Sequence, residues 1–568
     1  MLPAAMHDDP PTNRVPSATR PLAGFVPVPE PRAAAYRRAG YWTGATLAGA
    51  LLERAGAHDP GRPALIGEGE TVAFGQLSGR VERLAAGLRG AGLRPGDRVV
   101  VQLPNSPDFV VLLLALWRAG LIAVMALPAY REHELRRVLD LSEAAAIAVP
   151  ERLHRADHLA TVRGLLRERA RATTLVVAGA TGPLEPGEVA LSALAGAPAE
   201  PDRPWPAEPG DVAALLLSGG TTALPKLIPR THADYLYNLR ISADICRVGE
   251  RTVYLAALPV AHNFALGCPG VLGTLLSGGT AVFLTAPHAT AVLRAIERHR
   301  VTMTAAVPPL ALQWADAAGR GEADLGSLEL LQVGGARLLP EAARRLRAAL
   351  PGRLQQVYGM AEGLLNFTRL DDPEPVVLET QGRPASPADE LRIVDETGRD
   401  VAGGAVGELW TRGPYTIAGY FRAEADNAVA FTSDGFFRTG DLVRRHRSGA
   451  LVVEGRLKDV INRGGEKVAA AELENVLLAH PGVLQAAAVA MPDSAMDEAI
   501  CVYVVARPGR APTLMEVRTF LADRGLARYK LPDRLETIDE LPVTAVGKVD
   551  KGRLRTAAAA AVAGEVRG

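Results

Sequence analysis

Leu215-Leu216-Leu217-Ser218-Gly219-Gly220-Thr221-Thr222-Ala223-Leu224-Pro225-Lys226 is an apolar run that enters a loop of glycines, threonines and one lysine. Such a loop offers backbone N–H groups, hydroxyl donors and a cation within one turn, and these groups bind polyphosphates. It is not a Walker P-loop, because the GxxxxGK[ST] spacing is absent and Leu227 follows the lysine. The residues therefore favour a phosphate-binding loop, although a plain surface loop would have the same composition.

Helix-like and strand-like segments alternate on both sides of this loop. Before it, apolar residues recur at helical spacing and then form a short buried run (Leu77, Val81, Leu84 and Leu88, then 98–103). After it, we expect an amphipathic helix over 291–299 and buried strands over 252–258, 279–284, 302–307 and 328–333. Alternation of this kind is typical of parallel sheets covered by helices. The predicted fold class is therefore α/β, with two stacked α/β subdomains.

The texture of the sequence changes twice toward the C-terminus. From Leu391 it consists of short strands separated by glycine turns, which indicates a small β-rich subdomain. After Arg456 it reads helix, strand, strand, helix, which indicates a compact α+β unit. We therefore predict a flexible leader over 1–24, a large N-terminal domain over 25–456, a hinge over 457–460 and a small C-terminal domain over 461–568.

Length and charge exclude several classes of protein. A chain of 568 residues with 48% apolar content has enough core for about three or four globular units. Lys and Arg together number 63, as do Asp and Glu, so the formal charge is zero. Nothing in the bulk electrostatics attracts a phosphate polymer or an anionic bilayer, and we expect neither nucleic acid nor a membrane as a partner.

Cysteine usage and hydropathy indicate a cytoplasmic protein. Cys246, Cys268 and Cys501 are too few and too scattered for a disulfide framework or a metal cage. Residues 1–24 lack the continuous apolar stretch of a signal peptide. The most apolar segment, 109–127, holds Arg118 at its centre, so we interpret it as a buried helix that runs into a strand.

Five further motifs follow the loop in a recognisable order: Tyr358–Gly363, Gly407-Glu408-Leu409, Tyr420 with Thr439-Gly440-Asp441, Gly455–Asp459, and Gly547–Lys551. Together with Ser218–Lys226 they resemble the adenylate-forming superfamily, which includes acyl-CoA synthetases, firefly-type luciferases and adenylation domains of nonribosomal peptide synthetases. The resemblance spans about residues 40 to 555. It implies an enzyme that uses ATP and Mg²⁺ to convert a carboxylic acid into an acyl adenylate, and whose small C-terminal domain is mobile.

The resemblance also implies roles for single residues. Lys548 would be catalytic and bridge the substrate carboxylate and the α-phosphate, while Lys458 would be the hinge residue. Glu362 would bind magnesium, or else cap a following helix. Asp441, assisted by Arg456, would accept hydrogen bonds from the ribose, or else be an ordinary turn aspartate. The complete ATP site would comprise Ser218, Gly219, Gly220, Thr221, Thr222, Lys226, Gly334, Gly335, Ala336, Val357, Tyr358, Gly359, Met360, Ala361, Glu362, Asp441, Arg456 and Lys548.

The segment Ala261–Gly270 narrows the class of acid. An amide beside an imidazole, followed by small and apolar residues, suits a flat acid with an ortho hydroxyl, since Asn263 can donate to and accept from that hydroxyl. With 227–235, 331–338, 358–373 and 461–475 it resembles the aryl acid-AMP ligases of siderophore assembly, which include salicylate-AMP and 2,3-dihydroxybenzoate-AMP ligases. The implied aryl-acid pocket consists of His262, Asn263, Phe264, Cys268, Gly335 and Leu365; His262 is alternatively a packed core histidine.

Two positions favour salicylate or a close 2-hydroxybenzoate. Cys268 and Leu365 stand where the resembled dihydroxybenzoate enzymes usually carry Ser and Val. Cysteine offers only a weak donor to a 3-hydroxyl, and leucine takes up room. A 2,3-dihydroxybenzoate-AMP ligase remains the alternative if both residues are ordinary core variation.

No carrier motif follows Lys551, so we expect the aryl group to pass to the phosphopantetheine thiol of an aryl carrier protein in trans. The alternatives are an aryl-CoA ligase that uses coenzyme A, and a catalytically silent nucleotide-binding or carrier-docking protein of the same fold.

Overall fold

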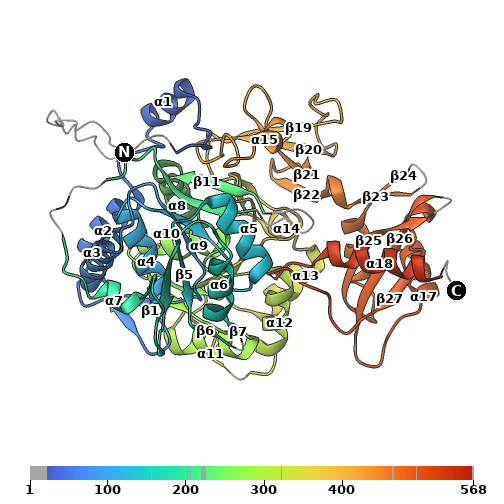
Figure 1. Cartoon of the computed structure of the whole chain (residues 1–568). Coiled ribbons are helices and arrows are strands. Elements are labelled where there is room, and N and C mark those ends of the chain that lie inside the picture. The colour runs from blue at the N-terminus through green and yellow to red at the C-terminus, as the bar shows by residue number, and fades with distance from the viewer. Residues whose placement is uncertain are drawn as a thin grey trace.

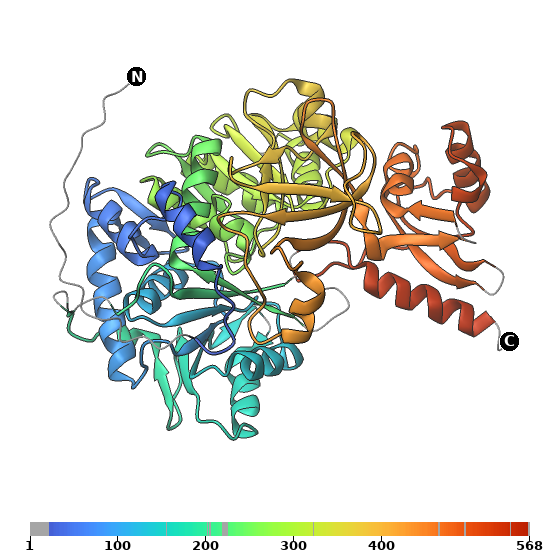
Figure 2. The same cartoon turned by 90° about the horizontal axis from the view of Figure 1, so that it is seen from above.

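The computed structural model describes residues 22–154, 156–200, 203, 206–218, 225–321, 323–463, 466–493, 496–545 and 547–565. Gly219, Gly220, Thr221 and Thr222 of the predicted phosphate loop lie outside these ranges, as does most of the predicted leader. Two α/β subdomains and a β-rich sheet form one body, and the C-terminal unit lies at one end of it (Figures 1 and 2). The predicted fold class is confirmed.

The first subdomain is built on a seven-stranded sheet in which all neighbours are parallel except β10 and β11. Its order is β11 (Leu227–Thr231), β10 (Val212–Leu217), β4 (Ile122–Met125), β3 (Arg98–Val101), β5 (Ala146–Pro150), β8 (Thr174–Ala178) and β9 (Glu188–Ala190). Strand residues alternate between two cores. Val99 and Val101 pack with α3 (Phe74–Gly90) and α4 (Pro107–Arg118), and Val100 packs with α5 (Glu132–Ser142) and α6 (His158–Arg167).

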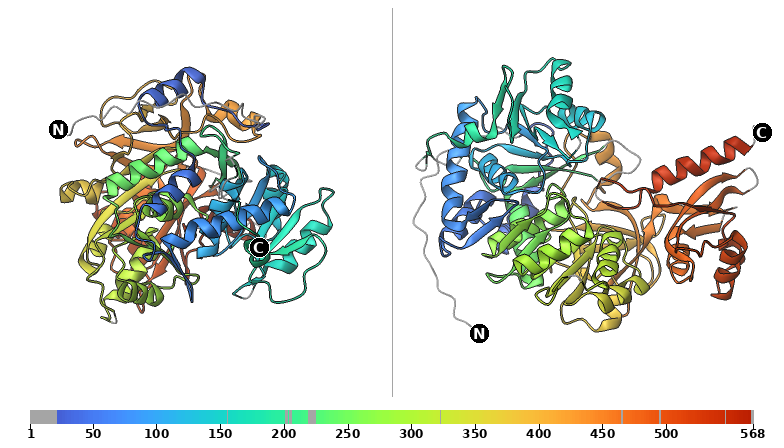
Figure 3. Two further views of the ribbon diagram at one scale, coloured as in Figure 1. Left: turned by 90° about the vertical axis from the view of Figure 1, so that its left-hand side faces the viewer. Right: turned by 90° about the horizontal axis from the view of Figure 1, so that it is seen from below.

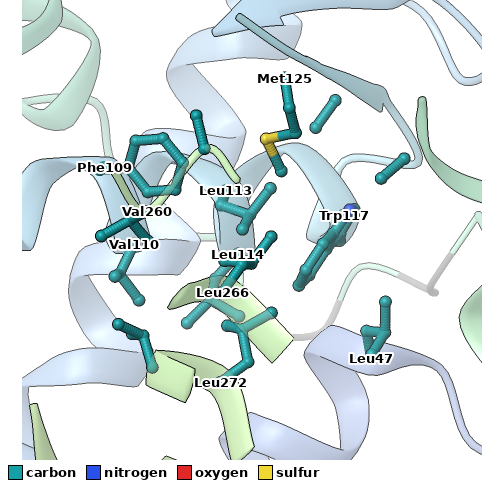
Figure 4. Packing of buried hydrophobic residues seen from close by; sticks show 14 of the residues in the cluster. Leu47, Phe109, Val110, Leu113, Leu114, Trp117, Met125, Val260, Leu266 and Leu272 are labelled. Atoms are coloured by element: carbon teal, nitrogen blue, oxygen red, sulfur yellow. The ribbon is translucent and has the colours of Figure 1, made fainter. Parts of the chain in front are cut away.

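Helix α4 is apolar almost all round because it is buried between the two subdomains. Figure 4 shows Phe109, Leu113 and Trp117 of α4 beside Leu266 and Leu272, which come from helices of the second subdomain. The helix ends at Arg118 and β4 begins at Ile122, which confirms the predicted helix and strand. None of the helices in the described ranges is long and apolar enough to cross a membrane.

The second subdomain is built on a nine-stranded sheet. Helices α11 (Ala289–His299), α12 (Pro308–Ala318) and α13 (Pro340–Ala349) cover one face, and α8 (His232–Cys246) and α10 (Gly270–Leu276) the other. The strand order is β18 (Arg383–Pro384), β17 (Leu365–Phe367), β16 (Arg353–Gly359), β15 (Leu330–Gly334), β14 (Met303–Ala306), β12 (Val253–Ala256), β13 (Thr280–Phe283), β1 (Pro63–Ile66) and β2 (Thr71–Ala73).

Both C-terminal predictions hold, with additions. The β-rich subdomain is an antiparallel sheet of β19 (Glu390–Val394), β20 (Gly407–Arg412), β21 (Phe437–Arg445) and β22 (Leu451–Arg456), and it lies between the second subdomain and the C-terminal unit (Figures 2 and 3). The C-terminal unit has the predicted α16 (Ala470–Leu477), β25 (Val483–Asp493), β26 (Asp497–Ala506) and α17 (Leu514–Asp523). It also has β23 (Val460–Arg463), β24 (Glu466–Ala469), β27 (Arg534–Thr537) and α18 (Lys551–Glu565), which the sequence analysis did not predict.

Shorter elements complete the chain: α1 (Glu30–Arg38), α2 (Leu47–Gly56), α7 (Leu191–Ala195), α9 (Asn263–Gly267), α14 (Glu374–Glu379), α15 (Glu424–Ala430), the hairpin of β6 (Arg152–Leu153) and β7 (Ala156–Asp157), and the 3₁₀ turns η1 (Leu457–Asp459) and η2 (Arg528–Lys530). The domain boundaries stay predictions. At the first of them, the N–H of Arg422 donates to the carbonyl of Gly24 at 3.0 Å, so the end of the predicted leader contacts the large domain.

Candidate functional site

The site forms where β15 and β16 end. These neighbouring parallel strands finish at Gly334 and Gly359, and their register pairs Gly334 with Val357. A Cβ on Gly334 would lie 2.5 Å from the carbonyl oxygen of Val357 and 3.1 Å from the Phe264 ring, so only glycine fits there. Gly335 follows with φ at +80°, and this left-handed turn leads the chain into Ala336. The strand ends are therefore closely packed around two glycines, next to the Phe264 ring.

Lys548 reaches this place from the small domain. Its N–H bonds to the Thr544 hydroxyl at 3.2 Å, and its carbonyl accepts from the Thr544 N–H at 2.7 Å, which makes a tight turn. A Cβ on Gly335 would lie 3.1 Å from Lys548 Cε. Burial and the charge of Arg456 lower the pKa of Lys548 to about 8, although the carboxylates of Asp441 and Glu362 act in the opposite direction. Three distant parts of the chain thus meet around one ammonium group.

Asp441 is held by two partners on its two oxygens. The Tyr358 hydroxyl donates to Oδ2 at 2.7 Å, and Arg456 Nε lies 3.0 Å from Oδ1. The register of β21 and β22 pairs Asp441 directly with Arg456. The side chain is almost fully buried, and its own N–H bonds to Thr439. Burial and this carboxylate raise the pKa of Tyr358 well above its usual value, so the phenol stays a donor. Asp441 is therefore a fixed acceptor rather than an ordinary turn aspartate.

Glu362 lies in a turn just after β16. The Tyr420 hydroxyl donates to its Oε1 at 2.9 Å, and burial raises the pKa of its carboxyl group. The chain continues from this turn into β17, so the alternative role as a helix cap is wrong. In the described part of the chain no three His, Cys, Asp or Glu side chains cluster as metal ligands. One hard carboxylate oxygen pair fits Mg²⁺, which usually takes one or two carboxylates and completes its shell with phosphate and water.

Lys226 and Ser218 close the two described ends of the predicted phosphate loop. The Lys226 N–H donates to the Ser218 hydroxyl at 3.0 Å, and the Ser218 N–H donates to the Lys226 carbonyl at 3.0 Å. The Lys226 ammonium lies 2.7 Å from Asp426 and 4.8 Å from the centre of the Tyr420 ring. Tyr420 therefore links the loop lysine to Glu362.

The predicted aryl-pocket residues gather beside the same strand ends. His262 begins α9 and its Nδ1 accepts from the Phe264 N–H at 3.3 Å. Burial, and secondarily the charge of Lys548, lower the pKa of His262 to about 3, so its imidazole is neutral. Leu365 of β17 lies against Gly359, where a Cβ would be 2.6 Å from Leu365 Cδ2. Asn263 and Cys268 are buried, with Asn263 Nδ2 3.6 Å from Cys268 Sγ.

Three of the residues that hold this site were not predicted as members of it. Tyr420 belongs to a quoted motif but had no role, Asp426 follows it on α15, and Tyr235 of α8 donates to Asn263 Oδ1 at 2.7 Å. In the sequence each of them is an ordinary aromatic or acidic residue, so motif spacing alone could not identify it as part of the site. Met360 and Ala361 shape the turn before Glu362, and the Ala361 carbonyl accepts from Arg230 at 3.2 Å.

Lys458 lies on the exposed turn η1 that joins β22 to β23, two residues after Arg456. Partial burial and the charge of Arg456 lower the pKa of Lys458, and Asp441 acts in the opposite direction, so this lysine is near the Asp441–Arg456 pair. The next residue, Asp459, pairs with Arg555 of α18 at 2.9 Å. The turn is therefore attached to the small domain.

A cavity of about 650 Å³ adjoins the site. Its walls come from loops that follow the parallel strands of both sheets and from one residue of the small domain: Asn105, Pro128, His158, Pro259, Thr285 and Ala545. Ala545 belongs to the turn that carries Lys548. The same short turn therefore lines the cavity and delivers the lysine.

Comparison with known proteins assigns these features to two family models. Residues 52–421 match the model described as AMP-binding enzyme, and residues 472–548 match the one described as AMP-binding enzyme C-terminal domain. The second match ends at Lys548.

Three characterised relatives resemble nearly the whole chain. They are a 2,3-dihydroxybenzoate-AMP ligase of Bacillus subtilis (48% identity, 94% of this chain and 98% of the relative), a salicylyl-CoA synthase/salicylate adenylyltransferase of a Streptomyces species (50%, 94% and 97%), and a salicyl-AMP ligase/salicyl-S-ArCP synthetase of Mycobacterium tuberculosis (48%, 95% and 95%). Among solved structures, apo MbtA of Mycobacterium smegmatis is similar with a TM-score of 0.72 and 47% identity over 94% of this chain and 99% of that one.

Proposed function

Because the chain belongs to the AMP-binding enzymes and, among them, to the aryl acid-AMP ligases, we propose that it adenylates salicylate or a close 2-hydroxybenzoate and then loads an aryl carrier protein. The observation that carries this proposal is the position of Lys548 against Gly335, with its pKa coupled to Asp441 and Glu362. These groups come from three segments that are distant in the sequence.

In the first half-reaction a carboxylate oxygen attacks the α-phosphorus of ATP, a P–O bond forms, and pyrophosphate leaves. Negative charge grows on the α-phosphate in that transition state, so a fixed cation beside it lowers the barrier. The Lys548 ammonium supplies that cation and can also hold the attacking carboxylate. Neutral His262 adds no competing charge.

The remaining side chains bind and orient the nucleotide. Adenine packs beside Gly334 and Gly335, and Asp441, which Arg456 holds in place at 3.0 Å, accepts from the ribose hydroxyls. Lys226 exchanges Asp426 for the terminal phosphates. Glu362 would hold Mg²⁺, which supplies neutralisation of phosphate charge when bound.

Salicylate is preferred to 2,3-dihydroxybenzoate because neither Cys268 nor Leu365 offers a strong hydrogen-bond partner to a 3-hydroxyl. Both side chains are almost fully buried, so a hydroxyl against them would lose water and gain only a weak sulfur contact. A 2,3-dihydroxybenzoate ligase is the second candidate, because the Bacillus subtilis relative is as similar to this chain as the salicyl-AMP ligase is.

The test is exchange of labelled pyrophosphate into ATP with benzoate, salicylate, 6-methylsalicylate and 2,3-dihydroxybenzoate in parallel. Salicylate should lead and benzoate should trail. Exchange with none of the hydroxylated acids would reject the function. For the acceptor, the yield of thioester on a phosphopantetheinylated aryl carrier protein should exceed that on coenzyme A, and the reverse result would make the chain an aryl-CoA ligase.

The catalytic lysine is tested with a matched control. Lys548→Ala should slow exchange by roughly 10²- to 10³-fold, as loss of one transition-state donor does. Lys551→Ala should change it little, because the Lys551 ammonium lies 2.7 Å from Glu474 within the small domain. Equal losses in both variants would contradict the assignment.

The metal site is tested by titration. Chelation of divalent cations should abolish exchange in the wild type and added Mg²⁺ should restore it. Glu362→Gln removes the charge but keeps the shape, so it should raise the Mg²⁺ concentration needed for half-maximal exchange. An unchanged Mg²⁺ requirement would remove Glu362 from the metal site.

A further inference from the structure

A buried hydrogen bond fixes the side chain on which the aryl-acid pocket depends. The Tyr235 hydroxyl donates to Asn263 Oδ1 at 2.7 Å, and Asn263 Nδ2 lies 3.6 Å from Cys268 Sγ. The thiol of Cys268 itself points toward the Asn263 backbone carbonyl at 3.4 Å. Tyr235, Asn263 and Cys268 are all buried.

The network orients the amide of Asn263. Tyr235 has a hydrogen to donate, since burial raises the pKa of its phenol. Among the described residues its hydrogen-bond partner is Asn263 Oδ1. If the amide were flipped, the phenol oxygen could accept from its N–H, but the buried phenol hydrogen would lose Oδ1 as its acceptor, which is costly. Asn263 therefore points its oxygen at Tyr235, and its NH₂ group faces away.

Tyr235 is itself held in place. The Arg230 guanidinium lies 4.7 Å from the centre of its ring and is fixed by Asp234 at 2.7 Å. On the other side, a Cβ on Gly267 would lie 2.6 Å from the Tyr235 hydroxyl oxygen, so glycine makes room for the phenol. The hydroxyl thus has one available position.

The oriented amide turns its donor group away from Tyr235. An amide nitrogen carries two hydrogens, and the described residues supply one partner, the weakly accepting sulfur of Cys268. The sequence analysis allowed Asn263 to donate to and accept from an ortho hydroxyl; because Oδ1 is directed at Tyr235, the side of the amide that faces away from Tyr235 offers a ligand the hydrogens of Nδ2. Salicylate meets this demand, because its phenolic hydrogen can bond to its own carboxylate while its oxygen accepts from Asn263.

We propose that Tyr235 is a specificity-determining positioning residue that makes this pocket select an ortho acceptor, the 2-hydroxyl, against an ortho donor such as the 2-amino group of anthranilate. The inference rests on the proposed function, which brings the acid to Asn263. The lone pair of an aniline nitrogen is delocalised into the ring, so this nitrogen presents N–H groups. These donors would face the NH₂ donors of the Asn263 amide. Without Tyr235 the amide can turn over and accept from an amine.

The test compares kcat/KM in pyrophosphate exchange for salicylate and anthranilate. In the wild type salicylate should exceed anthranilate by about tenfold or more, as expected for a buried donor left unpaired. Tyr235→Phe should lower the salicylate value and bring this ratio down by about tenfold, through both a poorer hydroxyl contact and a better amine contact. If the wild type prefers 2,3-dihydroxybenzoate, the pair becomes that acid and 3-hydroxyanthranilate, with the same expectation.

Tyr237→Phe is the matched control. Tyr237 lies two residues further along α8, is also buried, and bonds through its hydroxyl to Ser386 at 2.7 Å. Its loss should lower the melting temperature comparably but leave the ratio unchanged. A wild-type ratio near one, or a Tyr235→Phe ratio equal to that of the wild type, overturns the inference alone. No exchange by the wild type with any aryl acid overturns the proposed function and the inference together.

Discussion

Within the site, burial shifts the pKa of single side chains more than any one neighbouring charge does. Lys548 illustrates this, because its ammonium is desolvated and lies near Arg456, and its pKa falls to about 8. A lysine in that range changes its charge under conditions in which the protein can be assayed.

The charge of Lys548 predicts the pH profile of the first half-reaction. The ammonium is charged below its pKa and neutral above it, so kcat/KM for ATP should be level below about pH 8 and fall tenfold per unit above it. Lys548→Arg should keep any residual activity independent of pH over that range, because guanidinium does not deprotonate there. A wild-type profile that stays level well above this pKa would contradict the role of the ammonium.

Cys268 predicts how the preference for the acid can be changed. Cys268→Ser replaces a weak donor with a hydroxyl, so it should raise kcat/KM for 2,3-dihydroxybenzoate relative to salicylate by about tenfold. Cys246→Ser is the control, since Cys246 is equally buried but contacts Gln355 at 3.2 Å. An equal shift in both variants would show that residue 268 has no special role in choice of acid.

At the scale of elements, the large domain depends on α4 and the helix beside it. Arg118 at the end of α4 is fully buried and pairs with Glu82 of α3 at 2.6 Å. The apolar helix tolerates this arginine because the Glu82 carboxylate on the neighbouring helix neutralises its charge.

Breaking this pair predicts a large loss of stability. Arg118→Ala leaves the Glu82 carboxylate buried and unpaired, which should lower the free energy of unfolding by about 3–5 kcal/mol. Arg136→Ala breaks exposed pairs with Glu132 of α5 and with Glu168, and it should cost far less because solvent screens both pairs. Denaturant titrations of the two variants measure the difference, and similar losses would show that the buried pair contributes no more than the exposed pairs.

Local patterns predicted most of these elements, and tertiary pairing explains the rest. The strands expected over 98–103 and 279–284 are β3 and β13, because continuous apolar runs signal strands buried on both faces. That β1 joins the second sheet, with Leu65 paired to Ala281, could not be read from the sequence, since register across such a separation leaves no local trace. Helix α18 was missed because its alanine-rich sequence has little amphipathic pattern.

The sequence motifs predicted that Lys548, Glu362 and Asp441 belong to one site, and the structure brings these three side chains together, while their roles stay predictions. Their supporting partners were not predicted, because Tyr235 and Asp426 act through distances that the fold alone creates. The backbone of the glycine and threonine positions 219–222 stays a prediction.

For the whole molecule, Lys548 of the small domain lies against Gly335 of the large domain, which is the arrangement that the proposed first half-reaction requires. The turn η1 is exposed and continues into the small domain, where Asp459 is anchored by Arg555. Rotation about this turn would carry the lysine away from the site.

This predicts that a stiffened hinge separates the two half-reactions. Lys458→Pro restricts φ and removes an N–H at the turn, so it should leave pyrophosphate exchange within a few-fold of wild type while slowing thioester formation by at least about tenfold. Both steps are measured on the same preparation of the variant, so the rate of pyrophosphate exchange is the control for the rate of thioester formation. Parallel losses in both steps would mean that the substitution perturbs the site rather than the hinge.

The shared turn around Ala545 has a consequence for the order of events. One short segment carries the ammonium and also supplies Ala545 to the wall of the neighbouring 650 Å³ cavity. A movement that withdraws the lysine would therefore reshape that cavity at the same time. We expect this shared turn to couple departure of the ammonium to access for the second substrate.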